Sequence, residues 1–224
     1  MYSRTELLIG SENIEKLKNA KVLVVGLGGV GGYALEALVR VGVGELGLCD
    51  FDIVDVSNKN RQILALDSTI GKAKTEVAKE RVKEINPDCK ISVFNLKLDE
   101  ENISELNLVK WDYVAECIDD VNAKIALVKT CKATNTKIIS SMGTGNKLNS
   151  DAFEIADIKK TEQDRLARSL RKRLKDEGGM SLDVLFSKES PVQDQIDIIP
   201  SISYMPAIAG LKIAEFIIKQ IIGL

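Results

Sequence analysis

Short aliphatic runs alternate with amphipathic segments along the first two thirds of the chain. The aliphatic runs are rich in Val, Ile and Leu, as buried strands are, and lie at residues 21–26, 45–49, 90–95, 112–118 and 137–141. Helical patterns occupy 5–18, the stretch carrying Leu35, Leu38 and Val39, 71–86 and 122–134. Strands joined through helices run parallel, with right-handed crossovers. The pattern therefore predicts an α/β fold: a Rossmann-like, mostly parallel sheet with flanking helices.

The pattern changes after Gly145. The sequence then predicts strands at 151–157 and 182–186, a helix at 161–176, a loop at 187–200 and an apolar helix at 206–224. Lys212, Glu215 and Lys219 form one polar stripe on this last helix, and three charges in so short a segment argue against a membrane span. We expect the helix to pack on the sheet or against a second subunit, without integral membrane insertion. Peripheral membrane contact through it is left open.

A cluster of glycines separates the first predicted strand from its helix. Gly26, Gly28 and Gly29 allow close backbone approach, and the start of the helix offers free N–H groups and a positive dipole end to an anion. Asp50 follows the next strand, at the place of a carboxylate that holds a ribose. This combination favours a nucleotide site, although glycine-rich turns also serve for close packing alone.

Composition narrows the class of protein. The 224 residues hold 31 basic and 33 acidic side chains, so any contact with a nucleic acid or an anionic membrane must be local. There is no histidine, and no CxxC pair joins the cysteines, which are Cys49, Cys89, Cys117 and Cys131. We therefore expect free thiols and no zinc. The first residues lack the pattern of a signal peptide, and we expect a cytoplasmic protein.

One predicted helix concentrates positive charge. Residues 165–175 contain no acid and six cations, which are Arg165, Arg168, Arg171, Lys172, Arg173 and Lys175. The alternative to a binding surface is a solvated helix face, balanced by Asp164, Asp176 and Glu177 at its ends.

Polar side chains gather after successive predicted strands. They are Asp50, Asp52, Asn58, Arg61, Gln62, Lys74 and Asp119. A dinucleotide needs only the glycines and a ribose carboxylate, whereas a triphosphate needs cations, which Arg61, Lys74 and a metal at Asp119 would supply. The set therefore favours ATP over NAD. We expect Lys74 and Asp119 to face solvent at the sheet edge, so that replacing either would leave the fold intact.

The order of these motifs resembles the adenylating domain of the ubiquitin-activating-enzyme-like superfamily, which includes activators of sulfur-carrier proteins. The resemblance spans residues 1–145 and rests on the glycine turn, the run from Asp50 to Gln62, the segment 71–76 and the strand end at Asp119. It implies ATP and Mg2+, and an acyl-adenylate formed on a carboxylate substrate.

The resemblance also implies residue roles. The catalytic residues would be Arg61, Lys74 and Asp119, with Asp119 binding the metal. The nucleotide would lie against Gly26, Gly28, Gly29, Asp50, Asp52, Ser57, Asn58, Asn60, Arg61, Gln62 and Lys74. Arg4 matches an arginine that reaches the ATP of the partner subunit, which implies a homodimer.

Departures from the superfamily narrow the choice. Members that pass the acyl group to a thiol carry a cysteine after the fifth strand, yet no cysteine follows Cys131. Residues 85–89, 141–147, 155–175 and 186–191 instead resemble the tRNA threonylcarbamoyladenosine dehydratases. In that family the threonyl carboxylate of the modified adenosine, beside the anticodon, is adenylated. A nitrogen of the same side chain then closes a five-membered ring as AMP leaves, which requires no thiol carrier.

This second resemblance implies a ligase-type enzyme whose partner is tRNA carrying threonylcarbamoyladenosine. The expected tRNA contacts are Arg165, Arg168, Arg171, Lys172 and Lys175, although Arg165 stands where relatives commonly have proline. Residues 1–224 are expected to form a single adenylating domain. It would comprise a nucleotide-binding core at 1–145 and a smaller extension of strands and helices at 146–224, on the substrate or dimer side.

Two alternatives stay open. The chain could adenylate the C-terminal carboxylate of a small sulfur-carrier or ubiquitin-like protein. It could also be a redox or nucleotide-binding module that uses the glycine turn for NAD, but Arg61 and Lys74 would then lack a purpose. A monovalent cation beside the site and a sulfur-transfer or redox protein partner are open as well.

Overall fold

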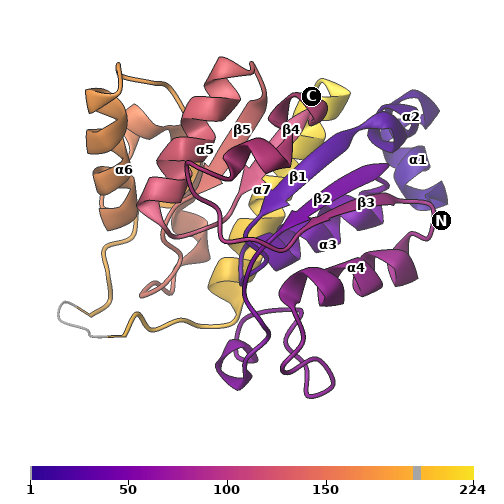
Figure 1. Ribbon diagram of the computed structural model, residues 1–224, viewed down its shortest axis with the longest axis horizontal. Helices are drawn as coiled ribbons and strands as arrows, with labels where there is room; N and C mark the ends of the chain where they lie inside the picture. Colours follow the sequence, from indigo (N-terminus) through magenta and orange to yellow (C-terminus); the bar gives the residue numbers. More distant parts are fainter. Residues whose placement is uncertain (1, 194–197) are drawn as a thin grey trace.

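One mostly parallel sheet forms the centre of the molecule (Figure 1). The computed structural model describes residues 2–193 and 198–224. The described strands follow the order β3-β2-β1-β4-β5-β7-β6, and only the pair of β6 and β7 is antiparallel. Their bounds are β1 Lys21–Val25, β2 Glu45–Cys49, β3 Lys90–Phe94, β4 Tyr113–Glu116, β5 Lys137–Ser141, β6 Phe153–Asp157 and β7 Asp183–Ser187. The prediction of an α/β, Rossmann-like fold is confirmed.

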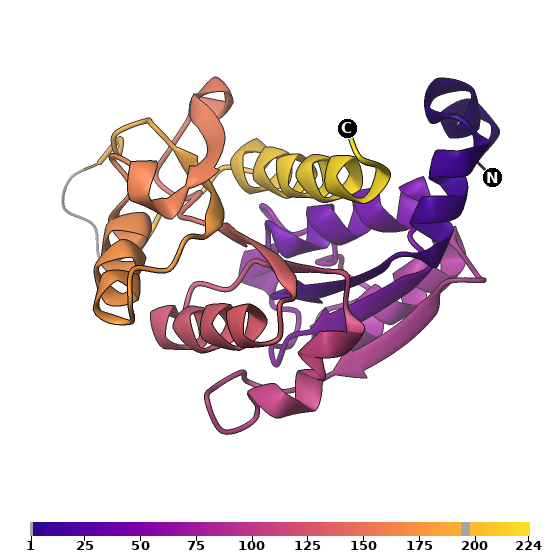
Figure 2. The same cartoon turned by 90° about the horizontal axis from the view of Figure 1, so that it is seen from above.

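Helices cover both faces of this sheet (Figure 2). One face carries α3 (Gly31–Val41), α4 (Lys74–Ile85) and α7 (Tyr204–Ile222), and the other carries α5 (Val121–Ala133) and α6 (Arg165–Asp176). Two short helices, α1 (Ser3–Ile9) and α2 (Ser11–Asn19), precede β1. The predicted segment 5–18 is therefore two helices, and none of the residues of α1 is buried.

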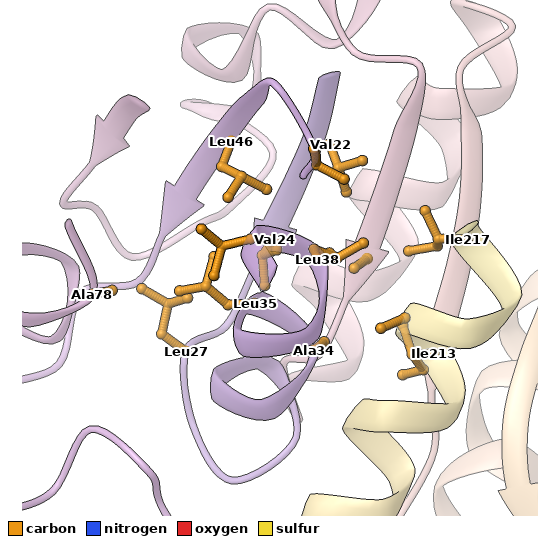
Figure 3. Packing of buried hydrophobic residues seen from close by; sticks show 14 of the residues in the cluster. Val22, Val24, Leu27, Ala34, Leu35, Leu38, Leu46, Ala78, Ile213 and Ile217 are labelled. Atoms are coloured by element: carbon orange, nitrogen blue, oxygen red, sulfur yellow. The ribbon is translucent and has the colours of Figure 1, made fainter. Parts of the chain in front are cut away.

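Strand β1 shows why the aliphatic runs of this sequence are nearly continuous. Val22 and Val24 point into one hydrophobic cluster, and Leu23 and Val25 point into the cluster on the opposite face. A parallel sheet covered on both faces buries every position of its central strands. Each such fully buried aliphatic side chain contributes about 2 kcal/mol. Figure 3 shows the first cluster, where β1, α3 and α7 meet.

Helix α7 lies against α3, as expected of an apolar helix that packs on the sheet. A Cβ on Gly210 would lie only 2.2 Å from the carbonyl oxygen of Val30, so the approach of the two helices requires glycine. Ile213 and Ile217 are fully buried in the same cluster as Ala34 (Figure 3). Within the described residues, no helix is both long and apolar enough to span a membrane.

Some boundaries differ from the predicted ones. Helix α6 begins at Arg165 instead of 161, because 158–160 forms a separate 3-10 turn and Asp164 caps the helix by accepting the N–H of Ala167 at 2.9 Å. Helix α7 begins two residues early, at Tyr204. The predicted loop at 187–200 is irregular after Ser187, and its residues 194–197 lie outside the described residues.

Candidate functional site

The glycine turn joins β1 to α3 at the carboxyl edge of the sheet, where ligands bind in open α/β folds. Gly26 has φ +90°, and a Cβ there would lie 2.7 Å from the carbonyl oxygen of Cys117, which directly follows the neighbouring strand β4. A Cβ on Gly31 would lie 1.7 Å from the carbonyl oxygen of Gly26. The two glycines are therefore required by the turn itself, whatever it binds.

The tip of the turn offers backbone donors. Among the described residues, the N–H groups of Gly28, Gly29 and Val30 have no acceptor. The carbonyl oxygen of Gly28, by contrast, accepts the N–H of Gly32 at 3.0 Å. These donors lie just before the first turn of α3, where the helix dipole adds partial positive charge. The arrangement fits an anion, and phosphate in particular.

Asp50 is buried and holds the turn in place. Its Oδ2 accepts the N–H of Leu27 at 2.6 Å and its Oδ1 accepts the N–H of Asp52 at 2.8 Å. Each carboxylate oxygen retains a second lone pair, so Asp50 can also accept from a ribose hydroxyl. The predicted ribose carboxylate therefore has a structural role as well.

Lys74 is the first residue of α4 and pairs with Asp52. Its Nζ lies 2.6 Å from Oδ2 of Asp52, and only 5% of the lysine side chain is exposed, against 47% of the aspartate. The expectation that Lys74 faces solvent is wrong. The connection from β2 to α4 folds back on itself through a bridge between Ile53 and Ala73, and the N–H of Lys74 donates to the carbonyl oxygen of Asp52 at 3.0 Å.

The polar segment 55–62 lies beside the glycine turn. The aliphatic part of Arg61 runs past Gly29, where a Cβ would lie 3.6 Å from Cγ of the arginine. A Cβ on Gly28 would likewise lie 3.8 Å from Nε2 of Gln62. Nη1 of Arg61 donates to the carbonyl oxygen of Ser57 at 3.0 Å and to Oδ1 of Asn60 at 2.9 Å. The structure thus brings these predicted residues together around the turn.

Asn58 serves the local backbone. Its Oδ1 accepts the N–H of Asp55 at 3.1 Å, and Asp55 in turn accepts the N–H of Ser57 at 2.8 Å. This reciprocal cap fixes the 3-10 turn Val56–Asn58 that precedes Arg61.

Asp119 and Asp120 follow β4 and differ in their surroundings. Asp120 caps α5 by accepting the N–H of Ala123 at 2.8 Å, whereas Asp119 is exposed and has no hydrogen-bond partner in the described part of the chain. No three His, Cys, Asp or Glu side chains of the described residues form a metal cluster. One free carboxylate fits Mg2+, which is held by one or two carboxylates together with phosphate oxygens and water.

A buried ion pair under this edge was missed by the sequence reasoning. Lys124 of α5 and Glu116 of β4 are both 0% exposed, with Nζ 2.6 Å from Oε2. Oε1 of Glu116 also accepts the N–H of Ile118 at 2.8 Å, Oε2 accepts the hydroxyl of Ser140, and Lys124 donates to the carbonyl oxygen of Ser141 at 2.8 Å. The network ties β4, β5 and α5 together. A glutamate inside an apolar strand, followed by a lysine on a mostly apolar helix, was the available signal.

Arg4 lies far from the glycine turn of its own chain. The neighbouring Tyr2 packs on Gly42, where a Cβ would be 2.8 Å from the tyrosine ring, and Gly42 ends α3 at the opposite end from the turn. Arg4 is exposed on α1. Its predicted contact with a partner subunit's nucleotide stays a prediction.

The basic helix exposes one stripe. Arg165, Arg168, Lys172 and Lys175 are exposed on the face opposite the buried residues of α6. Arg171 differs from these four, because its Nη1 donates to both the carbonyl oxygen and the hydroxyl of Thr161, each at 2.6 Å.

The four cysteines are poor nucleophiles at neutral pH. Burial raises the pKa of Cys89 to about 11 and the pKa of Cys49 and of Cys131 to about 12. Burial also raises the pKa of Cys117. Because the thiolate is the nucleophile, none of these thiols suits acyl transfer.

Comparison with known proteins identifies the family. The sequence model of the ThiF family matches residues 2–224. The chain belongs to the ThiF family.

Relatives of this ThiF-family chain include a tRNA threonylcarbamoyladenosine dehydratase of Bacillus subtilis strain 168. The two are 37% identical over 239 residues, which cover 99% of this chain and 94% of that protein. A solved structure of the E. coli tRNA N6-threonylcarbamoyladenosine dehydratase in complex with ATP matches with a TM-score of 0.93 at 33% identity, covering 99% of this chain and 93% of that one.

A second kind of relative matches only in part. A molybdopterin-synthase adenylyltransferase of Haemophilus influenzae is 40% identical, but the match covers 62% of this chain and 58% of that protein. Similarity to the dehydratases extends over nearly the whole of this ThiF-family chain. The resemblance stated from its motifs is confirmed.

Proposed function

We propose that this protein adenylates the threonyl carboxylate of threonylcarbamoyladenosine in tRNA at the expense of ATP, then cyclises it and releases AMP and pyrophosphate. The observation that carries the proposal is the glycine turn with free N–H donors, flanked by Arg61 and Lys74. Likeness to named dehydratases over 99% of the chain, one of them solved with ATP, selects the substrate.

The residues at the sheet edge fit a triphosphate. Gly28 to Val30 would donate their N–H groups to phosphate oxygens, and Asp50 would accept from the ribose. Lys74 would exchange the carboxylate of Asp52 for a phosphate oxygen, and Arg61 would add a second cation. Positioned cations stabilise the negative charge that builds on the phosphoryl groups as a carboxylate attacks.

Asp119 would hold Mg2+, which supplies further positive charge to the pyrophosphate when bound. The buried Glu116–Lys124 pair holds the backbone at Ile118, next to this carboxylate. Arg4 would complete the site of the partner subunit in a homodimer, since it lies away from the site of its own chain.

Ring closure then uses a group already attached to the substrate. The attacking nitrogen and the activated carboxyl carbon belong to one side chain, and such proximity replaces an external carrier. The raised pKa values of the cysteines support a path without a thioester.

The test is conversion of threonylcarbamoyladenosine in purified tRNA, followed by mass spectrometry of the nucleosides with ATP, Mg2+ and K+. The expected product nucleoside has lost one water, and AMP is released in equal amount. The Lys74→Ala variant should form no product. An unchanged nucleoside in the presence of the wild-type protein would refute the proposal.

A second candidate is activation of a carrier protein's C-terminal carboxylate, because the molybdopterin-synthase adenylyltransferase match includes 40% identity over 141 residues. Pyrophosphate exchange that requires a carrier ending in Gly-Gly, and no exchange with modified tRNA, would favour this candidate.

A further inference from the structure

A pocket lies outside the adenylation site, at the C-terminal half of α6. Its volume is about 280 Å3, and its lining is Ile158, Lys159, Arg171, Lys175, Gly179 and Met180. The walls come from the helix, the 3-10 turn Ile158–Lys160 and the loop that follows the helix. The pocket therefore adjoins the basic stripe at its last member, Lys175.

The pocket combines an apolar floor with a cationic rim. Ile158 is 1% exposed and belongs to the core, and Met180 packs against the same cluster. Gly179 has open space where a side chain would be. Lys159, Arg171 and Lys175 supply the charge. An apolar floor beside cations suits a planar apolar group that is linked to a phosphate.

Arg171 is restrained within this lining. Its two hydrogen bonds to Thr161 hold one guanidinium nitrogen in place, so the group loses little further entropy when a ring stacks on it. Arginine planes are a common stacking surface for the unpaired bases of RNA. This gives Arg171 a role that differs from those of the stripe residues.

The stripe leads from the pocket toward the adenylation site. Arg165, Arg168, Lys172 and Lys175 follow one another at intervals of three, four and three residues along one face. Asp164, just before the stripe, contacts Lys147 at 3.4 Å in the segment that follows β5 at the carboxyl edge of the sheet. Of the two acids at the far end, Asp176 and Glu177, the second is paired with Lys129 at 2.9 Å.

We propose that the pocket binds one unstacked base of the tRNA, with the phosphates before it lying along the stripe. The proposal rests on the proposed function, because it takes the RNA to be the substrate tRNA. From Asp164 to Lys175 the helix axis advances about 17 Å, which is the length of roughly five stacked nucleotides. The bound base would therefore be a few nucleotides from the modified adenosine.

Binding to abasic RNA tests this directly. A synthetic anticodon stem-loop containing threonylcarbamoyladenosine is made with a single abasic site at each other loop position, and Kd is measured by fluorescence anisotropy without ATP. We expect one position to weaken binding roughly tenfold, within the range for one stacked base. In the Met180→Trp variant, the larger side chain fills the pocket, so the same abasic site should not weaken binding any further.

Controls separate this base from general charge. Lys172→Glu should weaken binding of every RNA by a similar factor and reduce its salt dependence, whereas Lys90→Glu, an exposed cation on the opposite edge strand β3, should change neither. Equal Kd values for every abasic RNA would overturn the proposal, even if Met180→Trp fails to fold. The proposal would also be overturned if the abasic site weakened binding equally in a folded Met180→Trp protein. It would likewise be overturned if AMP bound in the pocket and tRNA did not displace it.

Failure of this proposal and failure of the proposed function give different results. Conversion of intact tRNA together with indifference to every abasic site removes only the base pocket. An abasic effect at one position without any conversion of the nucleoside leaves the pocket in place and removes the dehydratase activity.

Discussion

The buried pair of Glu116 and Lys124 allows a sharp prediction about stability. Lys124→Met removes the ammonium group and leaves the carboxylate of Glu116, which is 0% exposed, without its cation. Ser140 and Ile118 would still donate to the carboxylate, but the carbonyl oxygen of Ser141 would lose its donor. Breaking a buried pair from one side costs about 3–5 kcal/mol.

This loss is a large part of the free energy of unfolding, which is about 5–15 kcal/mol for a folded domain. For a chain of this size, about 1 kcal/mol lowers Tm by roughly 2–4 °C, so Tm should fall by about 6–20 °C. Circular dichroism during heating and urea titration measure the change. The double variant Glu116→Gln with Lys124→Met should recover part of it, because no unpaired charge is then buried.

Two results would contradict this reasoning. A loss below about 1 kcal/mol in Lys124→Met would mean that water reaches the carboxylate, as it does in exposed ion pairs. A double variant less stable than Lys124→Met would mean that the hydrogen bonds which Ile118 and Ser140 donate to the carboxylate outweigh the cost of burying it without a cation. Lys79→Met, which disrupts an exposed pair with Glu76, is the matched control and should change Tm little.

Further predictions concern the site, the cap of helix α5 and unfolding in acid. Asp119→Asn should lose Mg2+-dependent pyrophosphate exchange at unchanged Tm, whereas Asp120→Asn should keep much of its exchange activity, since asparagine also caps helices. Lys74→Ala should lose exchange and also lower Tm, because the lysine is buried against Asp52. Burial alone raises the pKa of Glu36, but hydrogen bonds from two arginines outweigh it and hold that pKa below its ordinary value. The stabilising effect of the Glu36 carboxylate is therefore present above about pH 4.3 and lost as pH falls through the lowered pKa. In Glu36→Gln, the free energy of unfolding should consequently depend less steeply on pH in that range.

Each of these has an outcome that contradicts it. Equal exchange by Asp119→Asn and wild type would show that this carboxylate holds no metal. A Lys74→Ala protein with wild-type Tm would mean that the pair with Asp52 adds nothing to folding. A Glu36→Gln protein whose acid unfolding curve keeps the wild-type shape would remove Glu36 from the set of acid-sensitive groups.

Local patterns were sufficient to predict the strands and the glycine turn. The aliphatic runs at β1, β2 and β5 record burial on two faces, and Gly26 marks a backbone conformation that few other residues adopt. Such signals are carried by neighbouring residues, and so they are visible in the sequence.

Pairings between distant segments were not visible. The sequence showed strands at β6 and β7 but not that they extend the same sheet, since strand pairing is set by packing on both faces and not by the strand's own residues. Lys74 pairs with Asp52, which lies 22 positions away in the sequence, and the Lys124 pair depends on where β4 and α5 meet. Arg171 read as one more surface cation, because its contact with Thr161 crosses from the helix to a preceding turn.

The contact between α7 and the glycine turn has a consequence for synthesis on the ribosome. Gly210 fits against Val30, and Pro206 lies beside Gly29, where a Cβ would be 3.0 Å from the proline. The turn is translated long before α7, the helix that supports it. A nascent chain arrested before Pro206 would lack that support. Nucleotide affinity should therefore arise only after α7 has been translated, although the residues proposed to contact the nucleotide precede it in the sequence.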